Sequence, residues 1–422
     1  MSIQELYVEF LNANGVCTDT RQIKGGELFF ALKGPSFNGN TFAQKAIDLG
    51  CSKVVIDDED FQIEGKTILV ENVLATLQQL SSHHRDNLNI PIIGITGSNG
   101  KTTTKELLYA VLSKKYATLS TFGNLNNHIG VPLTLLSVKK QHEMAIIEMG
   151  ANHVGEIAFL CSLAKPNYGL ITNIGKAHIG EFGGFDNIIK GKTELYRFIA
   201  QNKGLIFINS DDELLMKRRD GIKSVYFGKG QKYNGTIQDA GHHLSIQVSS
   251  PWSEQIQTNL YGDYNLSNVL SALAIGDFFN VSNSDMVDAI EEYMPTNNRS
   301  QMLTTDRNTL ILDAYNANPS SMHAALENFA ESEGNKFAIL GDMLELGGYT
   351  DEEHSKVIAL TRKYNIESIF VGEYFKKNAS DTNAFLNVEE IISSGILSNL
   401  NDRSILIKGS RKIKLERLAE VL

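Results

Sequence analysis

The residues with the clearest chemical potential form a glycine-rich turn at positions 97–100, followed by Lys101 and Thr102. An apolar run at 91–95 precedes the turn, and a helical pattern follows it from residue 105 to 113. At such a strand–loop–helix junction, backbone N–H groups attract polyphosphate, a lysine adds positive charge and a threonine hydroxyl can hold Mg²⁺. The segment therefore predicts a nucleotide-binding loop.

The loop departs from the usual P-loop pattern at one position. The pattern G-x-x-x-x-G-K-[ST] places glycine at position 95, where this chain has isoleucine. The alternative interpretation is a glycine-rich turn between a strand and a helix that carries an exposed lysine. The strand before the loop and the helix after it favour nucleotide binding.

A glutamate and a histidine follow two other predicted strands. Glu148 ends the apolar run 144–148, where a carboxylate beside a P-loop can coordinate Mg²⁺ directly or through water; the alternative is a solvated glutamate. His178 lies in a glycine-rich loop, and a lone histidine is more often structural or exposed than a ligand. By residue type alone, Lys192 is an ordinary helical lysine.

Two amide-rich segments suggest recognition of polar ligands. Residues 124–128 crowd amides into one loop, although asparagine is also common in turns because it tolerates the left-handed conformation. Residues 313–322 combine an aspartate at a strand end with amides that suit a ribose or a peptide, although Asn-Pro can also simply begin a helix. Lys408-Gly-Ser-Arg411 resembles a small anion nest or a basic turn.

The elements that position these residues alternate between strand and helix. Between about residues 90 and 295 this alternation indicates a parallel sheet with right-handed crossovers, in which ligands bind beyond the carboxyl ends of the strands. The glycine-rich loop, Glu148 and Asn173 all lie at such ends. The predicted strands are 92–95, 144–148, 168–174 and 204–208, and predicted helices include 187–202 and 265–279.

The flanking segments predict two further α/β domains. Residues 224–261 are β-rich, and we expect antiparallel strands at the edge of the central sheet. The polar stretch 81–89 marks a first boundary, after strands 28–32 and 53–56 and the helix 40–49 between them. After residue 295 a doubly wound pattern restarts, with strands 309–313, 336–340, 368–371, 384–386 and 404–407. The expected domains are residues 1–88, 89–296 and 297–422.

Composition indicates a soluble protein. The 422 residues are 42% hydrophobic and 21% charged, and the net charge of −10 argues against a nucleic-acid binder. Three widely spaced cysteines without a C-x-x-C motif indicate reduced thiols rather than disulfides or a zinc site. The N-terminus lacks the features of a signal peptide, and no apolar run is long enough to span a bilayer. We therefore expect a cytoplasmic protein without membrane insertion.

Taken together and in this order, the segments resemble the Mur ligase family. Its looser T-G-x-x-G-K-T loop accommodates Ile95. The central motifs are Thr96-Gly-Ser-Asn-Gly-Lys-Thr-Thr103, Glu148-Met-Gly-Ala-Asn152, residues 171–178, Lys192-Thr-Glu194 and Tyr261-Gly-Asp-Tyr-Asn-Leu-Ser-Asn268. Residues 123–136, 313–322 and 340–347 resemble the branch that acts on D-alanyl-D-alanine. Residues 18–21 and 26–34 resemble its uridine-nucleotide domain, so the similarity covers essentially the whole chain.

The resemblance implies a fold and a reaction. The fold is α/β with three domains: a small UDP-substrate domain, a central P-loop ATPase domain with a parallel sheet, and a Rossmann-like C-terminal domain. The reaction is the ATP-dependent addition of D-alanyl-D-alanine to UDP-N-acetylmuramoyl-tripeptide through an acyl phosphate, in cytoplasmic peptidoglycan precursor synthesis. We expect a monomer that uses ATP and Mg²⁺.

The resemblance also assigns roles at the phosphate end of the site. Lys101 would neutralise the phosphates, Thr102 and Glu148 would hold one Mg²⁺, and Glu148 and His178 a second. Lys192 matches the family lysine that is carbamylated, which would make it an anionic ligand. The ATP-binding residues implied are Gly97, Ser98, Asn99, Gly100, Lys101, Thr102, Thr103, Asn265, Asn268, Arg299 and Asp313.

Substrate contacts are implied in all three domains. Those for the uridine diphosphate end are Thr20, Arg21 and Asn38. Those for the muramoyl-peptide are Asn124, Asn126, Asn127 and His128. Those for the dipeptide or the reacting carboxylate are Tyr315, Asn316, Asn318 and Lys408.

Two other functions are compatible with parts of the pattern. One is another amide ligase of the family, either the enzyme that adds the third peptide residue or a folylpolyglutamate synthase; residues 313–319 speak against both. The other is an inactive module that binds UDP-muramoyl peptides. The presence of Lys101, Glu148, His178 and Lys192 argues against an inactive module.

Overall fold

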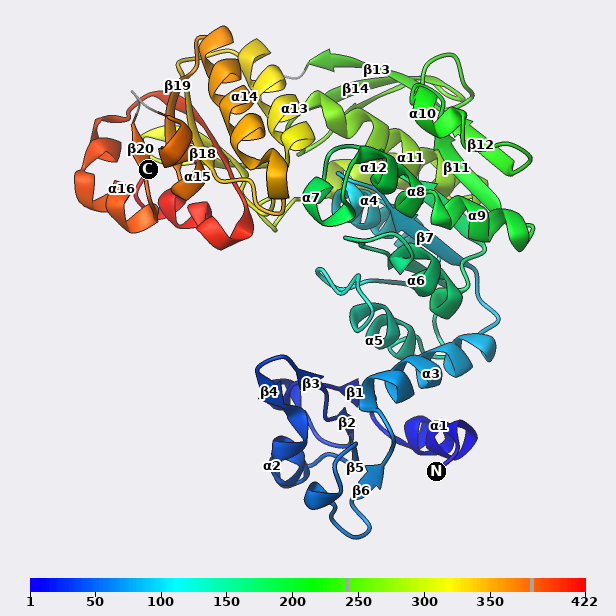
Figure 1. Cartoon of the computed structure of the whole chain (residues 1–422). Helices are drawn as coiled ribbons and strands as arrows, with labels where there is room; N and C mark the ends of the chain where they lie inside the picture. Colours follow the sequence, from blue (N-terminus) through cyan, green and yellow to red (C-terminus); the bar gives the residue numbers. More distant parts are fainter. Residues whose placement is uncertain (240–242, 380–382) are drawn as a thin grey trace.

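The chain folds into three α/β domains, each built around its own sheet (Figure 1). The structure is a computed structural model that describes residues 1–239, 243–379 and 383–422. In Figure 1 the N-terminal domain (blue) and the C-terminal domain (yellow to red) lie at two different sides of the central domain. The expected fold class is thereby confirmed. Within the described ranges, no helix is long and apolar enough to cross a membrane.

The N-terminal domain is a four-stranded parallel sheet with strand order β1-β2-β5-β6. The strand β2 is buried along its whole length, as expected for a parallel strand covered on both faces. The loops after the four strands therefore meet at one edge of the sheet. The elements are α1 Ile3–Asn12, β1 Val16–Cys17, β2 Leu28–Phe30, β3 Lys33–Gly34, β4 Phe37–Asn38, α2 Ala43–Asp48, β5 Lys53–Ile56, β6 Thr67–Leu69 and α3 Val73–Asp86.

The polar stretch at 81–89 is partly helix and partly buried. It contains the end of α3, where His84 and Arg85 lie against the central domain. Arg85 donates hydrogen bonds to the carbonyls of Ala164 (2.8 Å) and Lys165 (3.0 Å), which satisfies acceptors at the end of a helix. His84 Nε2 lies 2.9 Å from the carbonyl of Val138. These polar side chains therefore attach the N-terminal domain to the central one.

The central domain has a six-stranded parallel sheet with strand order β12-β11-β10-β7-β9-β8. The strands β7 Ile92–Thr96 and β9 Met144–Glu148 are buried throughout and pair directly, so the loops after them are neighbours. The other elements are α4 Lys101–Ser113, β8 Thr118–Ser120, α5 Gly130–Leu136, α6 Glu156–Ala164, β10 Tyr168–Ile171, α7 Ile179–Phe182, α8 Phe185–Lys192, α9 Glu194–Gln201, β11 Leu205–Asn209, α10 Glu213–Met216, β12 Lys223–Phe227, α11 Leu266–Phe278 and α12 Asn283–Glu292.

Three expectations for this domain need correction. The expected helix 187–202 is two helices, α8 and α9, which meet at Thr193; its hydroxyl donates to the carbonyl of Ile189 (2.8 Å), a bond that bends helices. The strand expected at 168–174 already ends at Ile171. The antiparallel strands do not extend the main sheet. They form a separate sheet of β13 Asn234–Asp239, β14 Ser245–Ser250 and β15 Glu254–Gln257, whereas β12 joins the main sheet in parallel.

The C-terminal domain has a six-stranded sheet with strand order β16-β17-β21-β18-β19-β20. Its first strand, β16 Gln301–Thr304, was not expected and pairs antiparallel with β17 Asn308–Asp313. The remaining strand pairs are parallel, so β17 and β21 Arg403–Lys408 end side by side, with Asp313 opposite Lys408. The other elements are α13 Pro319–Glu331, β18 Lys336–Gly341, α14 Thr350–Lys363, β19 Glu367–Val371, α15 Glu373–Asn378, β20 Ala384–Phe385 and α16 Val388–Ser394.

Candidate active site

A cleft of about 580 Å³ collects most of the predicted site residues from the central and C-terminal domains. It lies where the carboxyl ends of β7, β9 and β17 face one another, the position expected for ligands of parallel sheets. The predicted residues that line it are Ser98, Asn99, Gly100, Lys101, Thr102, Thr103, Asn124, Asn126, Asn127, His128, Glu148, His178, Asn265, Asn268, Arg299, Asp313, Tyr315, Asn316, Asn318 and Lys408.

The glycine-rich loop takes the strand–loop–helix form that its sequence predicts. Gly97 has a φ of +150°, and a Cβ there would lie 2.0 Å from the Thr172 hydroxyl, so only glycine fits. The Lys101 ammonium folds back and donates to the carbonyls of Gly97 (2.8 Å) and Ser98 (3.2 Å). Desolvation of this ammonium lowers the pKa of Lys101 to about 8. The loop therefore presents a cation with few water contacts at the start of α4.

Glu148 ends β9 inside this cleft and is almost fully buried, with 1% of its surface exposed. The Asn126 side-chain amide donates to its Oε1 (2.7 Å). Its Oε2 accepts no hydrogen bond from the described residues, and the Lys105 ammonium lies 3.7 Å away. A buried carboxylate oxygen with a free lone pair, in a cleft that Thr102 also lines, fits a site for Mg²⁺.

His178 begins the short helix α7 with a left-handed backbone conformation (φ +55°). Its Nδ1 lies 2.6 Å from a carboxylate oxygen of Glu345 and 3.4 Å from one of Glu181. The ligand atoms of these three residues all lie within 4.8 Å of one another, which is a spacing suited to a metal ion. The structure thus places His178 beside two carboxylates that the sequence analysis did not assign to the site, and among the described residues no ion pair joins His178 to Glu148.

Lys192 ends α8 and is buried, with 1% of its surface exposed. Its ammonium nitrogen donates to the carbonyl of Ala151 (3.2 Å) and lies 5.4 Å from the centre of the Phe182 ring. Burial and the nearby Lys101 charge lower the pKa of Lys192 well below the ordinary lysine value. A lowered pKa increases the fraction of neutral amine, which is the form that reacts with CO₂. Lys192 and Gly97 do not line the cleft itself.

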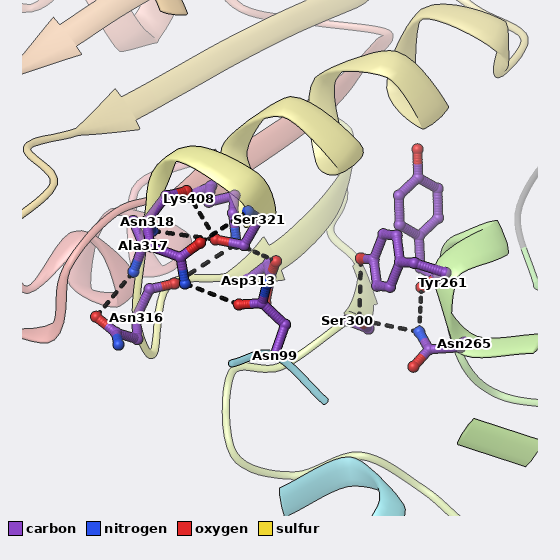
Figure 2. A network of polar contacts seen from close by, with 11 residues as sticks. Asn99, Tyr261, Asn265, Ser300, Asp313, Asn316, Ala317, Asn318, Ser321 and Lys408 are labelled. Atoms are coloured by element: carbon purple, nitrogen blue, oxygen red, sulfur yellow. Dashed lines mark hydrogen bonds and ion pairs between the residues drawn. The ribbon is translucent and has the colours of Figure 1, made fainter. Parts of the chain in front are cut away.

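Two asparagines of the last motif lie behind the glycine-rich loop. Asn268 Nδ2 donates to Asn265 Oδ1 (2.8 Å), and the Thr104 hydroxyl of α4 donates to Asn268 Oδ1 (3.0 Å). Asn265 Nδ2 in turn donates to the carbonyl of Tyr261 (2.8 Å) and to the Ser300 hydroxyl (3.3 Å). Figure 2 shows these two contacts of Asn265, of which the one with Ser300 links the start of α11 to the C-terminal domain.

The C-terminal domain contributes a compact polar group. Lys408, itself 2% exposed, donates to Asp313 Oδ2 (2.5 Å) across β17 and β21. The Asn318 amide at the start of α13 donates to Asn99 Oδ1 (2.7 Å) of the glycine-rich loop, so the two domains touch there (Figure 2). The Arg299 guanidinium lies over the Tyr315 ring, 3.6 Å from its centre.

The three residues predicted for the uridine diphosphate end lie outside this cleft. Thr20 and Arg21 follow β1, and Asn38 ends β4 after β2, so they lie on the loop side of the N-terminal sheet. The exposed Arg21 guanidinium pairs with Asp19 (2.6 Å), and the Asn38 side chain accepts from the Asn40 N–H (3.0 Å). The structure places these residues at one edge of the sheet but gives no contact between them.

Sequence reasoning missed three charged residues at the site: Lys105, Glu181 and Glu345. Lys105 follows Lys101 by four residues, and this helical spacing puts both on one side of α4, a signal that was available. Glu181 is three residues after His178, which is also a neighbouring helical position. Glu345 lies in the motif 340–347, but the sequence did not show its contact with His178, because that contact forms between domains.

Comparison with known proteins covers nearly the whole chain. Family models match residues 12–94 (Mur ligase family, catalytic domain), 95–276 (Mur ligase middle domain) and 298–411 (Mur ligase, glutamate ligase domain). The UDP-N-acetylmuramoyl-tripeptide–D-alanyl-D-alanine ligase of Bacillus subtilis is 33% identical over 429 residues, covering 97% of this chain and 93% of the relative. The Escherichia coli enzyme of the same name is 30% identical over 441 residues, covering 99% and 95%.

Solved structures of MurF proteins have the same fold over nearly the whole chain. MurF from Acinetobacter baumannii superposes with a TM-score of 0.87 at 30% identity, covering 100% of this chain and 98% of that one. MurF from Thermotoga maritima, solved in complex with ADP, shares the fold with a TM-score of 0.84 at 24% identity, covering 97% of each chain. The chain belongs to the Mur ligase family, and the two curated relatives above, which it matches nearly from end to end, are UDP-N-acetylmuramoyl-tripeptide–D-alanyl-D-alanine ligases.

Proposed function

We propose that this chain catalyses the ATP-dependent addition of D-alanyl-D-alanine to UDP-N-acetylmuramoyl-tripeptide in peptidoglycan synthesis. The observation that carries the proposal is one cleft that joins a phosphate-binding loop, a buried carboxylate and polar groups of a second domain. A ligase that must assemble ATP, a peptide carboxylate and an amine needs such a site between domains. End-to-end similarity to enzymes of this name supports the same substrates.

The proposed chemistry has two steps. An oxygen of the peptide carboxylate attacks the γ-phosphorus of ATP, and ADP leaves. The amine nitrogen of D-alanyl-D-alanine then attacks the carbonyl carbon of the acyl phosphate, and inorganic phosphate leaves from the tetrahedral intermediate. In the first step two anions must approach each other, so the Lys101 ammonium neutralises the phosphates and lowers this barrier.

The residues present fit a divalent cation at the phosphates. Thr102 and Glu148 would hold Mg²⁺, which when bound supplies positive charge to the β- and γ-phosphates. His178 would contribute to a second cation site, where Glu181 and Glu345 also offer oxygens. The buried amine of Lys192, with its lowered pKa, is suited to carbamylation, and the carbamate would add a negative charge on this side of the site.

We assign the substrates to the three domains by the position of the predicted residues. The adenine end of ATP would lie toward Asn265 and Asn268, with Arg299 and Asp313 approaching from the C-terminal domain. Asn124, Asn126, Asn127 and His128 would meet the muramoyl-peptide. Thr20, Arg21 and Asn38 would bind the uridine diphosphate. Tyr315, Asn316, Asn318 and Lys408 would meet the dipeptide or the reacting carboxylate.

We propose a cytoplasmic monomer, because the reaction needs ATP and a nucleotide-linked substrate and residues of one chain line the cleft.

Phosphate release from ATP tests this function. With UDP-N-acetylmuramoyl-tripeptide present, we expect phosphate release that depends on D-alanyl-D-alanine and yields one amide product per phosphate, detectable by mass spectrometry. A Lys101→Met variant is the inactive control. Release with a different amine but not with the dipeptide would indicate another amide ligase of the family. ATP binding without turnover for any amine would indicate a binding module.

A further inference from the structure

A buried lysine beside Glu148 has no part in the chemistry described above. Lys105 lies on α4, one helical turn after Lys101, and only 2% of its surface is exposed. Its ammonium donates to the carbonyl of Gly123 (3.1 Å) and lies 3.7 Å from Glu148 Oε2. One side chain of the nucleotide-binding helix therefore touches both the cation-binding carboxylate and the loop that carries the amide-rich segment.

Lys105 balances the charge of Glu148 inside the protein. A carboxylate that is 1% exposed is strongly destabilised without a cation nearby. The Lys101 ammonium also interacts electrostatically with Glu148, but its hydrogen bonds go to the carbonyls of Gly97 and Ser98. Among the described residues, Lys105 is the cation recorded within 4.0 Å of Glu148.

The loop 121–129 is fixed to Glu148 by two further bonds. The Thr121 hydroxyl accepts from the Glu148 backbone N–H (2.9 Å). The Asn126 side-chain amide donates to Glu148 Oε1 (2.7 Å). The backbone carbonyl of Asn126 accepts from the Gly150 N–H (2.8 Å). Lys105 adds the third attachment, at Gly123, between these two points. The position of the loop 121–129 therefore depends on the interactions that Glu148 makes.

We propose that Lys105 is a positioning residue that couples divalent cation binding at Glu148 to the binding of the muramoyl-peptide by the loop 121–129. The inference rests on the proposed function. A cation at Glu148 Oε2 competes for the carboxylate and repels the Lys105 ammonium, which leaves the Gly123 carbonyl as the partner of that ammonium. The loop is then held more firmly, so it loses less conformational entropy when the muramoyl-peptide binds.

Coupling of this kind is reciprocal and can be measured without turnover. We would determine the affinity for UDP-N-acetylmuramoyl-tripeptide by calorimetry with ADP present, once in EDTA and once in saturating Mg²⁺. Wild-type protein should bind the peptide at least about fivefold more tightly with Mg²⁺. In Lys105→Met, which keeps the length of the side chain but not its charge, this ratio should fall close to one. Lys105→Arg should restore part of it.

Lys114→Met is the matched control. Lys114 follows the last turn of the same helix, where its ammonium pairs with Glu292 (2.7 Å) far from the cleft, and this variant should keep the wild-type ratio. Thermal unfolding of each variant shows that it is folded. A folded Lys105→Met protein with the wild-type ratio would overturn the proposal, since a lysine needed only for stability leaves the ratio unchanged.

Hydrogen exchange in the wild-type protein gives a second test that depends on no variant and on no peptide. With ADP present, the amides of residues 121–129 should exchange more slowly in Mg²⁺ than in EDTA. Unchanged exchange in this loop would overturn the coupling. Failure of the peptide to bind under any condition would instead reject the proposed function, and the exchange result would stand separately from it.

Discussion

The Nδ1 atom of His178 in the central domain lies 2.6 Å from a carboxylate oxygen of Glu345 in the C-terminal domain. The His178 ring at this distance lowers the pKa of Glu345, which favours the carboxylate form. The Gly180 N–H also donates to the carbonyl of Glu345 (3.2 Å). Glu345 itself has a φ of +67°, a rare conformation for a residue with a side chain. The C-terminal domain therefore presents Glu345 in a fixed position to the loop that carries His178.

A first prediction concerns the glycines at this contact. A Cβ on Gly180 would lie 2.5 Å from Gly347 N and Leu346 C, both of them backbone atoms that cannot turn away. We expect Gly180→Ala to separate the domains, raise the radius of gyration in small-angle scattering and slow ligation by about 100-fold, since misplaced groups lose that much. Gly348→Ala is the control, because a Cβ there meets nothing within 4 Å. Wild-type scattering and turnover in Gly180→Ala would contradict a functional contact.

The lowered pKa of Lys101 predicts a pH dependence of nucleotide binding. Phosphates bind the protonated ammonium, whereas the free protein loses this proton as the pH rises through about 8. The affinity for ADP should therefore be about tenfold weaker at pH 9 than at pH 7, with proton uptake on binding at the higher pH. Calorimetry in buffers of different ionisation enthalpy measures both effects.

Lys101→Arg provides the comparison for this pH dependence. A guanidinium stays protonated throughout the range, so its affinity for ADP should not change between pH 7 and pH 9. The same tenfold loss in Lys101→Arg would show that another group causes the pH dependence.

The stacking of Arg299 on Tyr315 makes a third prediction. The guanidinium carbon lies 3.6 Å from the ring centre, and the Arg299 Nε has no hydrogen-bond partner among the described residues. A cation–π contact stabilises this position by about 1 kcal/mol, so Tyr315→Ala should weaken ADP binding about fivefold. Tyr315→Phe keeps the ring and should bind ADP like the wild type. Equal affinities for all three proteins would show that the stack does not position Arg299 for the nucleotide.

Sequence patterns predicted the strands that are buried on both faces. Continuous apolar runs such as 92–95 and 144–148 end at clear turn signals, and they form β7 and β9. The β-rich stretch 224–261 correctly indicated antiparallel strands. It carried no information about the partner strand, so the separate sheet of β13, β14 and β15 could not be distinguished from an extension of the main sheet.

The site could be predicted wherever its residues are close in the sequence. The loop 97–103 is a local motif, and its geometry follows from its own glycines. Lys105 and Glu345 act through contacts with residues 43 and 167 positions away in the sequence, because Lys105 meets Glu148 and Glu345 meets His178. Lysine and glutamate on a helix or loop are usually solvated, and only the packing of distant segments gives these two a role.

Lys192 makes the last prediction, which concerns its modification. Burial lowers the pKa of this amine, which favours the neutral form that reacts with CO₂ to give a carbamate. We expect Lys192→Ala to be nearly inactive in the phosphate-release assay and to regain part of its activity with a short carboxylate such as acetate, which would fill the space of the carbamate. Lys190→Ala, in an exposed residue of the same helix, should behave as the wild type and should not respond to acetate. Wild-type turnover in Lys192→Ala would remove the carbamate from the mechanism. Inactivity without any rescue, in a protein that unfolds at a much lower temperature, would assign Lys192 a role in stability only.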